Sequence, residues 1–127
     1  MTPFELIARK QKVGQEYADE AELFVLVHFD AAKRGRLGPI GYNFISRHLV
    51  MAQYIGYRVK LAPLLDLARA AGDAWAKVGA RPGENVSLTT TEYHAVRAGL
   101  RMYFKTLPRI EAGTYRQACN VADQVMP

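Results

Sequence analysis

A chain of 127 residues is long enough for one folded domain and too short for two ordinary ones. Half of its residues are hydrophobic and 23% are charged, a balance that excludes a disordered tail. The formal net charge of +5 favours acidic partners, nucleic acid among them. The single cysteine, Cys119, excludes an internal disulfide framework and an all-cysteine metal site.

The hydrophobic runs along the chain are short. The longest, residues 23–27, falls far below the ~20 residues that a membrane-spanning helix needs. The N-terminus lacks the charged start and the apolar stretch of a signal peptide. We therefore expect a cytoplasmic protein that has no membrane partner.

The first residues of the chain predict a helix over residues 2–8. Thr2 is a suitable N-cap and Pro3 fits the first helical position. Glu5 stands three residues after Thr2, which is the spacing of a capping box. Gly14 either ends this helix or lies inside a longer one.

Residues 15–33 predict a second helix, because apolar residues recur there at spacings of three and four. The predicted inward residues are Tyr17, Ala21, Phe24, Val25 and His28. Residues 23–29 are apolar all round, which is typical of a helix buried at the centre of a domain. A strand is the alternative for this heptapeptide, since valine and phenylalanine favour strands. We favour the helix because the alanine-rich flanks continue its period.

Glycine and proline mark two loops in the rest of the chain, at residues 33–41 and 79–85. Between these loops, residues 42–60 recover the helical period. Pro63 then opens a further helix, which has a regular apolar stripe.

The C-terminal part predicts two more helices from their end signals. Thr89 and Glu92 have capping-box spacing and start the first of these helices. Pro108 ends it, and Gly113 with Thr114 caps the last helix.

The predicted fold is therefore all-α: a compact bundle of five or six helices forming a single domain over residues 1–127. The loops between the predicted helices are short, so consecutive helices should pack as neighbours.

Three histidines, His28, His48 and His94, fall in three different predicted helices. They either converge on a metal or acid–base site or serve separate structural roles. No pair has the spacing of a metal motif, so we favour a buried structural role for His28. Glu16 and Glu20 share a helical face, for which a solvated surface is the simpler interpretation. We predict no catalytic residue, no metal ligand and no cofactor.

Two helical faces combine positive charge with aromatic or apolar side chains. In the first, Tyr54 stands between two arginines, on the side of its helix opposite Ile45 and Leu49. An exposed aromatic residue there stacks on bases or on a partner's side chains. The alternative is that another helix packs Tyr54 and Met51. The second face carries basic residues at spacings of three and four, beginning at His94. The predicted partner-binding residues are Arg47, Met51, Tyr54, Arg58, Arg97, Arg101 and Lys105.

These patterns lead to three functional hypotheses. The first, which we favour, is a non-enzymatic binding or adaptor module that acts on a protein partner. In one form of this hypothesis the module acts through self-association. The second is a nucleic-acid-binding regulator that uses the same basic faces. The third is a small metal-dependent or acid–base enzyme. The absence of a catalytic motif such as the Gly-x-Ser-x-Gly elbow places the enzyme last.

Overall fold

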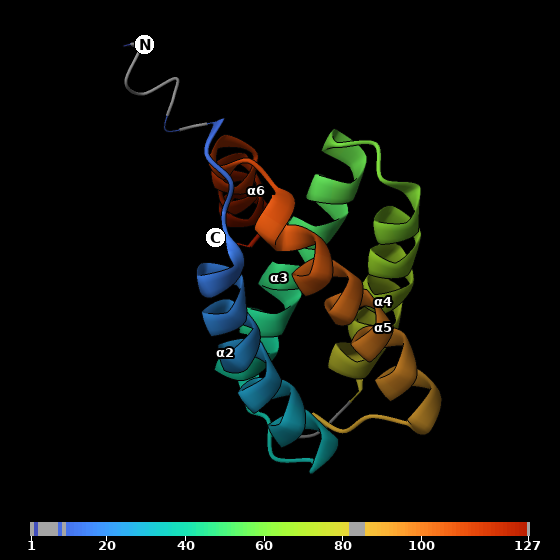
Figure 1. The fold of residues 1–127 in the computed structure, drawn as a ribbon. Coiled ribbons are helices and arrows are strands. Elements are labelled where there is room, and N and C mark those ends of the chain that lie inside the picture. Colours follow the sequence, from blue (N-terminus) through green and yellow to red (C-terminus); the bar gives the residue numbers. More distant parts are fainter. Residues whose placement is uncertain (1, 3–7, 9, 82–85, 127) are drawn as a thin grey trace.

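Helical periodicity dominates the chain, and the computed structural model, which describes residues 2, 8, 10–81 and 86–126, is helical accordingly. The described residues form five α-helices and no strand, so the all-α prediction is confirmed (Figure 1). The helices are α2 (Gln15–Lys33), α3 (Pro39–Arg58), α4 (Ala62–Ala80), α5 (Thr90–Thr106) and α6 (Ala112–Val125), and a 3₁₀ turn, η1 (Leu107–Arg109), lies between the last two. The helix predicted over residues 2–8 falls largely outside the described residues.

Local side-chain signals set the start of α5. The Thr89 hydroxyl accepts a hydrogen bond from the Glu92 backbone N–H (3.2 Å), and the Glu92 carboxylate accepts one from the Thr89 N–H (2.9 Å). The predicted capping box is thus confirmed. The second Glu92 oxygen binds Arg81, which also donates to the Ser87 carbonyl (3.1 Å). This network ties the end of α4 to the start of α5.

Three boundaries refine or correct the prediction. α3 begins at Pro39, inside the predicted loop, because a proline in the first turn loses no helical hydrogen bond. α6 begins at Ala112, so Gly113 and Thr114 lie inside the helix instead of capping it. Gly14 is the N-cap of α2, and its φ of +89° interrupts helical backbone at that point.

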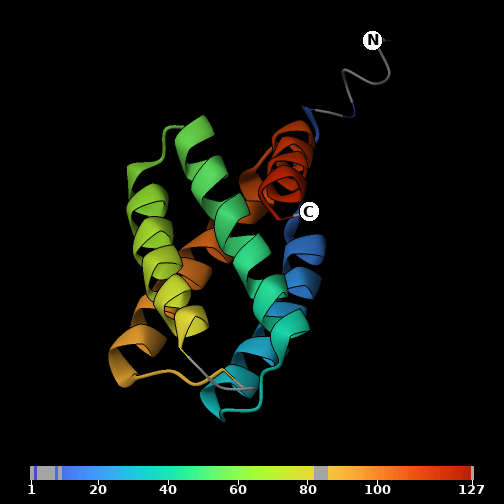
Figure 2. The ribbon, with the colours of Figure 1, turned by 180° about the vertical axis from the view of Figure 1, so that it is seen from behind.

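Two glycines allow α4 to pack closely on its neighbours. A Cβ atom on Gly56 of α3 would lie 2.8 Å from the backbone nitrogen of Leu65, and one on Gly99 of α5 would lie 2.9 Å from the carbonyl oxygen of Leu67. Any larger residue would push these backbones apart. α6 packs on α3, and α2 lies at the edge of the bundle against α3, α5 and η1 (Figures 1 and 2). The largest fully buried side chains are Trp75, Tyr103, Ile45, Leu49, Met51, Ile55, Leu64, Leu107, Val25 and Val96.

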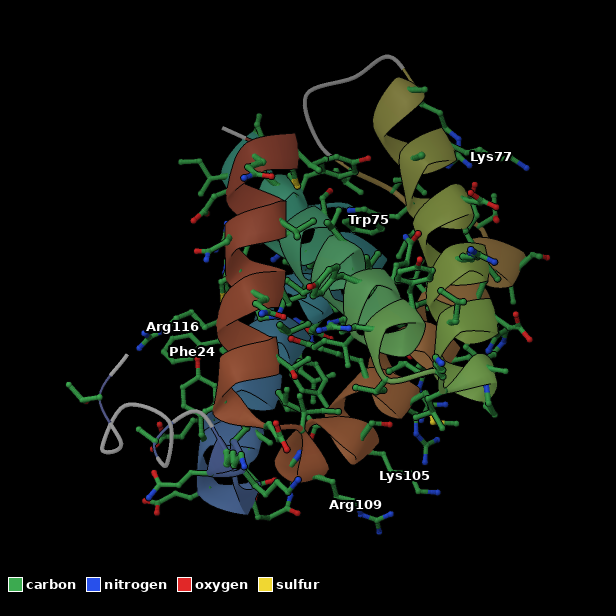
Figure 3. All side chains as sticks on the ribbon, turned by 90° about the horizontal axis from the view of Figure 1, so that it is seen from above. Phe24, Trp75, Lys77, Lys105, Arg109 and Arg116 are labelled. Carbon is green, nitrogen blue, oxygen red and sulfur yellow. The ribbon has the colours of Figure 1, made fainter. Side chains whose placement is uncertain are left out.

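α2 has the predicted bounds but not the predicted burial. Its buried residues form one stripe, made of Ala18, Val25, Phe29 and Ala32. Leu23, Phe24 and Val27 are instead 65%, 66% and 62% exposed. Phe24 stands at the periphery of the molecule in Figure 3. The prediction of a centrally buried helix is wrong, and so is the inward placement of Tyr17 and Phe24, because the bundle covers only one side of α2.

Trp75 of α4 anchors the contact between α3 and α4. Its side chain is 2% exposed and stacks on Tyr42, with ring centroids 4.9 Å apart and planes 11° from parallel. The indole N–H lies 3.0 Å from the Ser46 hydroxyl and donates to it. The Tyr42 hydroxyl in turn donates to the Trp75 carbonyl (2.8 Å). Burial, stacking and satisfied polar groups therefore coincide at this residue.

Replacing Trp75 by alanine should lower the free energy of unfolding by about 3–5 kcal/mol, since it removes a large buried aromatic side chain and leaves a cavity. Urea unfolding measures this change in free energy. Circular dichroism is the signal to follow, because the substitution removes the only tryptophan and with it the tryptophan fluorescence. Lys77→Ala, an exposed change on the same helix, is the matched control and should change stability by less than about 0.5 kcal/mol. Equal effects of the two substitutions would contradict the placement of Trp75 in the core.

Candidate functional site

The face of α3 that carries Arg47 and Tyr54 is covered by α6. Arg47 forms an ion pair with Asp123, and its guanidinium also reaches the Cys119 carbonyl (3.4 Å). The Tyr54 hydroxyl donates to the Gln117 side-chain oxygen (3.2 Å). These polar groups therefore bind within the protein and do not form an exposed stacking platform. The interpretation in which another helix packs Tyr54 is the correct one.

Met51 and Arg58 belong to the same predicted stripe but differ in exposure. Met51 is 1% exposed and belongs to the core. Its predicted place on a surface stripe is wrong, because α3 is a central helix with neighbours on several sides. Arg58 is exposed at the C-terminal end of α3, beside Tyr57, which is also exposed.

The predicted basic face of α5 is exposed. We call Arg97, Arg101 and Lys105 the basic row; the three residues follow one another at intervals of four along one flank of α5. None of their side chains forms an ion pair or hydrogen bond with another described residue. His94, one turn before the row, is exposed and has its ring against Tyr93. The row thus offers positive charge that no described residue pairs.

The basic row runs along a cleft between α2 and α5, which we call the α2–α5 cleft. One part has a volume of about 230 Å³ and is lined by Glu22, Leu26, Phe29, Tyr93, Arg97, Leu100, Arg101 and Phe104. A wider, more open part of about 550 Å³ adds Gln15, Asp19, Leu67, Ala98, Met102 and Lys105. Carboxylates of α2 therefore stand on the opposite wall from the cations of α5. Lys105 projects to the outside in Figure 3.

A second surface feature is the outward side of α2, which sequence reasoning missed. Leu23, Phe24 and Val27 share this side at spacings of three and four, and we call them the α2 face. The signal was present in the sequence, since residues 23–29 are apolar all round. In a folded protein, other helices cover such a segment either on both sides or on one side only, and in the second case an apolar side stays exposed. The positions of the other helices decide which of these occurs.

The three histidines do not converge. His28 and His48 both contact the Phe44 ring, at 4.9 Å between ring centroids in each case, while His94 is exposed on α5. His48 is buried, with its Nδ1 atom 3.3 Å from the Tyr103 hydroxyl. No three His, Cys, Asp or Glu side chains gather into a metal-binding group in the part of the chain that the structure describes.

Burial shifts the pKa of the His48 imidazole. Desolvation, helped by the nearby Arg47 charge, lowers the pKa of its imidazole to about 4. In the unfolded chain the same ring has a pKa near 6.5. Unfolding therefore takes up a proton between pH 4 and pH 6.5, and the folded state loses stability as the pH falls through this window.

Acidification from pH 7.5 to pH 5 should lower the free energy of unfolding by about 2 kcal/mol through His48 alone. Urea unfolding at a series of pH values measures the effect. In His48→Gln this part of the pH dependence should disappear, whatever the variant's stability at neutral pH. His94→Gln, which removes an exposed histidine, is the matched control and should keep the wild-type slope. A slope that survives in His48→Gln would contradict the assignment.

Comparisons with known proteins found no relative of this chain. No protein-family model matches the chain, and neither a curated protein nor a solved structure is significantly similar to it. No helix in the described residues is both long and apolar enough to cross a membrane. The α2 face and the α2–α5 cleft, with its basic row, are two candidate binding features among the described residues.

Proposed function

We propose that the chain is a non-enzymatic protein-binding module and that the α2 face is its docking surface. The observation that carries the proposal is the exposure of Leu23, Phe24 and Val27, each close to two thirds exposed on one side of a single helix. Adjacent large apolar side chains on the surface of a small domain mark sites of protein contact. Leu26 extends this apolar surface toward the α2–α5 cleft.

The charges around the α2 face indicate the chemistry of the partner. Glu16 and Glu20 are exposed on the first half of α2. Asp30, one turn after Val27, is also exposed but forms an ion pair with Arg34. An apolar patch with an acidic border is complementary to an amphipathic helix that has basic residues beside its apolar stripe. We therefore propose a basic, amphipathic helical segment of a protein as the partner.

The proposal keeps the kind of partner that the sequence indicated but moves the site. Arg47 and Tyr54 are engaged by α6, and Met51 is in the core, so the α3 stripe no longer supports docking. The proposed location is the cytoplasm, where a lone thiol such as Cys119 is the ordinary state of cysteine. The enzyme hypothesis has no comparable observation behind it among the described residues.

A photoreactive benzoylphenylalanine in place of Phe24 tests the docking surface. On irradiation in the native cells it should form a covalent adduct with a specific protein, identified by mass spectrometry, because the partner covers this position. Adding Leu23→Gln and Val27→Gln should abolish the adduct by removing the apolar surface. The free energy of unfolding should change by no more than about 0.5 kcal/mol per substitution, since both residues are exposed.

The same photoreactive residue in place of the exposed Lys77 of α4 is the matched control and should give no such adduct. An adduct with a second copy of the chain would also support docking at the α2 face, with self-association as its form. The absence of a specific protein adduct at position 24, or an equal yield at position 77, would overturn the proposal.

Nucleic-acid binding is a second candidate, favoured by one observation. The basic row presents three cations at regular intervals along α5, and none of them has an ion-pair partner in the part of the chain that the structure describes. Against it, Asp19 and Glu22 line the same cleft and would repel a phosphate backbone. We rank this candidate below protein binding for that reason.

Replacing Arg97, Arg101 and Lys105 together by glutamine distinguishes the two candidates. If the row binds DNA or RNA, the triple change should weaken binding and flatten the slope of log K against log salt by up to ~3 units, because fewer counterions are released. Fluorescence anisotropy of labelled oligonucleotides at several salt concentrations measures this. Our proposal expects no micromolar binding at physiological salt. Micromolar binding that the triple change abolishes would reverse the ranking.

A further inference from the structure

The narrow part of the α2–α5 cleft has an apolar floor. Phe29, Leu100 and Phe104 are buried beneath it. Tyr93 stacks on Phe29, with ring centroids 5.2 Å apart and planes 7° from parallel. With its volume of about 230 Å³, this part of the cleft is smaller than the usual site for a drug-sized ligand. The space therefore suits a small body that is apolar on the side facing the floor.

Positive charge is concentrated at the rim of the same cavity. Arg97 and Arg101 line it one helical turn apart, and neither has an ion-pair partner among the described residues. Lys33 does not line the cavity, but its nitrogen lies over the ring of Tyr93, 5.0 Å from the ring centroid. Guanidinium groups bind carboxylates through two parallel hydrogen bonds, so arginine is better suited than lysine to bind a carboxylate head group.

The carboxylates on the opposite wall restrict which anions fit. Glu22 faces the narrow part, and Asp19 and Glu22 both line the wider part. A polyanion that extended along the basic row would meet both of these charges. A single carboxylate held between Arg97 and Arg101 meets two cations and at most one anion, and its apolar body covers the floor of the cavity.

We propose that the α2–α5 cleft is a binding site for a small monocarboxylate with an aromatic or apolar body, held by Arg97 and Arg101 over the Phe29–Tyr93 stack. The ligand is either a free metabolite of this class or the C-terminal residue of a peptide, since both present the same chemistry. This site is distinct from the α2 face and does not depend on the docking of a protein there.

Titration of the ¹⁵N-labelled protein with phenylacetate, followed by NMR, tests the proposal. Phenylacetate should shift amide signals of residues 22–29 and 93–104 with a Kd on the order of 0.1–1 mM, the range for a ligand of about ten heavy atoms. Phenylacetamide, which has the same shape without the charge, should bind at least about 10-fold more weakly. A tripeptide ending in phenylalanine, compared with its C-terminal amide, determines whether the site also accepts a peptide terminus.

The double variant Arg97→Gln/Arg101→Gln should weaken phenylacetate binding by about 10-fold or more while leaving the fold intact, because both side chains are exposed. Arg69→Gln/Arg116→Gln removes the same charge from exposed arginines elsewhere and should leave Kd unchanged. No shift at these residues up to 10 mM phenylacetate, equal binding of phenylacetamide, or equal effects of the two double variants would overturn the proposal. Tighter binding of inorganic triphosphate would also overturn it, in favour of a polyanion site.

Discussion

The close approach of α4 to both α3 and α5 is the constraint on which the rest of the structure depends. It is possible because Gly56 and Gly99 stand where a side chain would collide with the backbone of α4. Trp75 and its stacking partner Tyr42 hold the opposite end of the α3–α4 pair together. With α3 and α5 both committed to α4, the remaining helices have to pack on the sides that are left. α6 takes one side of α3, and α2 takes the edge beside α3 and α5.

This arrangement explains why the two basic stripes differ in the folded protein. α3 is central, so its second side is also occupied, and α6 supplies Asp123 and Gln117 to the polar groups of Arg47 and Tyr54. α5 packs its apolar stripe inward and turns Arg97 and Arg101 toward solvent along the α2–α5 cleft. Similar residue patterns thus end as an internal polar contact in one helix and as an unpaired rim of positive charge in the other.

The same arrangement leaves α2 with apolar side chains on its exposed side as well as on its buried side. Its inward stripe, Ala18, Val25, Phe29 and Ala32, holds it on the bundle, and the outward side carries Leu23, Phe24 and Val27 as well as acids. Apolar burial contributes roughly 25 cal/mol per Å², so covering these side chains would stabilise a complex without new polar contacts. The exposed acids on the first half of α2 would favour the proposed basic partner on electrostatic grounds, although the whole chain is basic.

The sequence by itself determined the helices, because their signals are local. The spacing of apolar residues placed α2, and the Thr89–Glu92 capping box placed the start of α5, since both depend on residues within a few positions of one another. Periodicity also identified the exposed basic row on α5. Periodicity also identified the buried sides of α4 and α5. Only the tertiary structure decided which side of α2 is buried and how many sides of α3 are covered. The neighbours of a helix come from distant parts of the chain. Residues 23–29 therefore gave no indication of which side the bundle would cover, and the pattern around Met51 and Tyr54 left open whether another helix packs them. The α2–α5 cleft likewise exists only because two segments about 70 residues apart pack side by side.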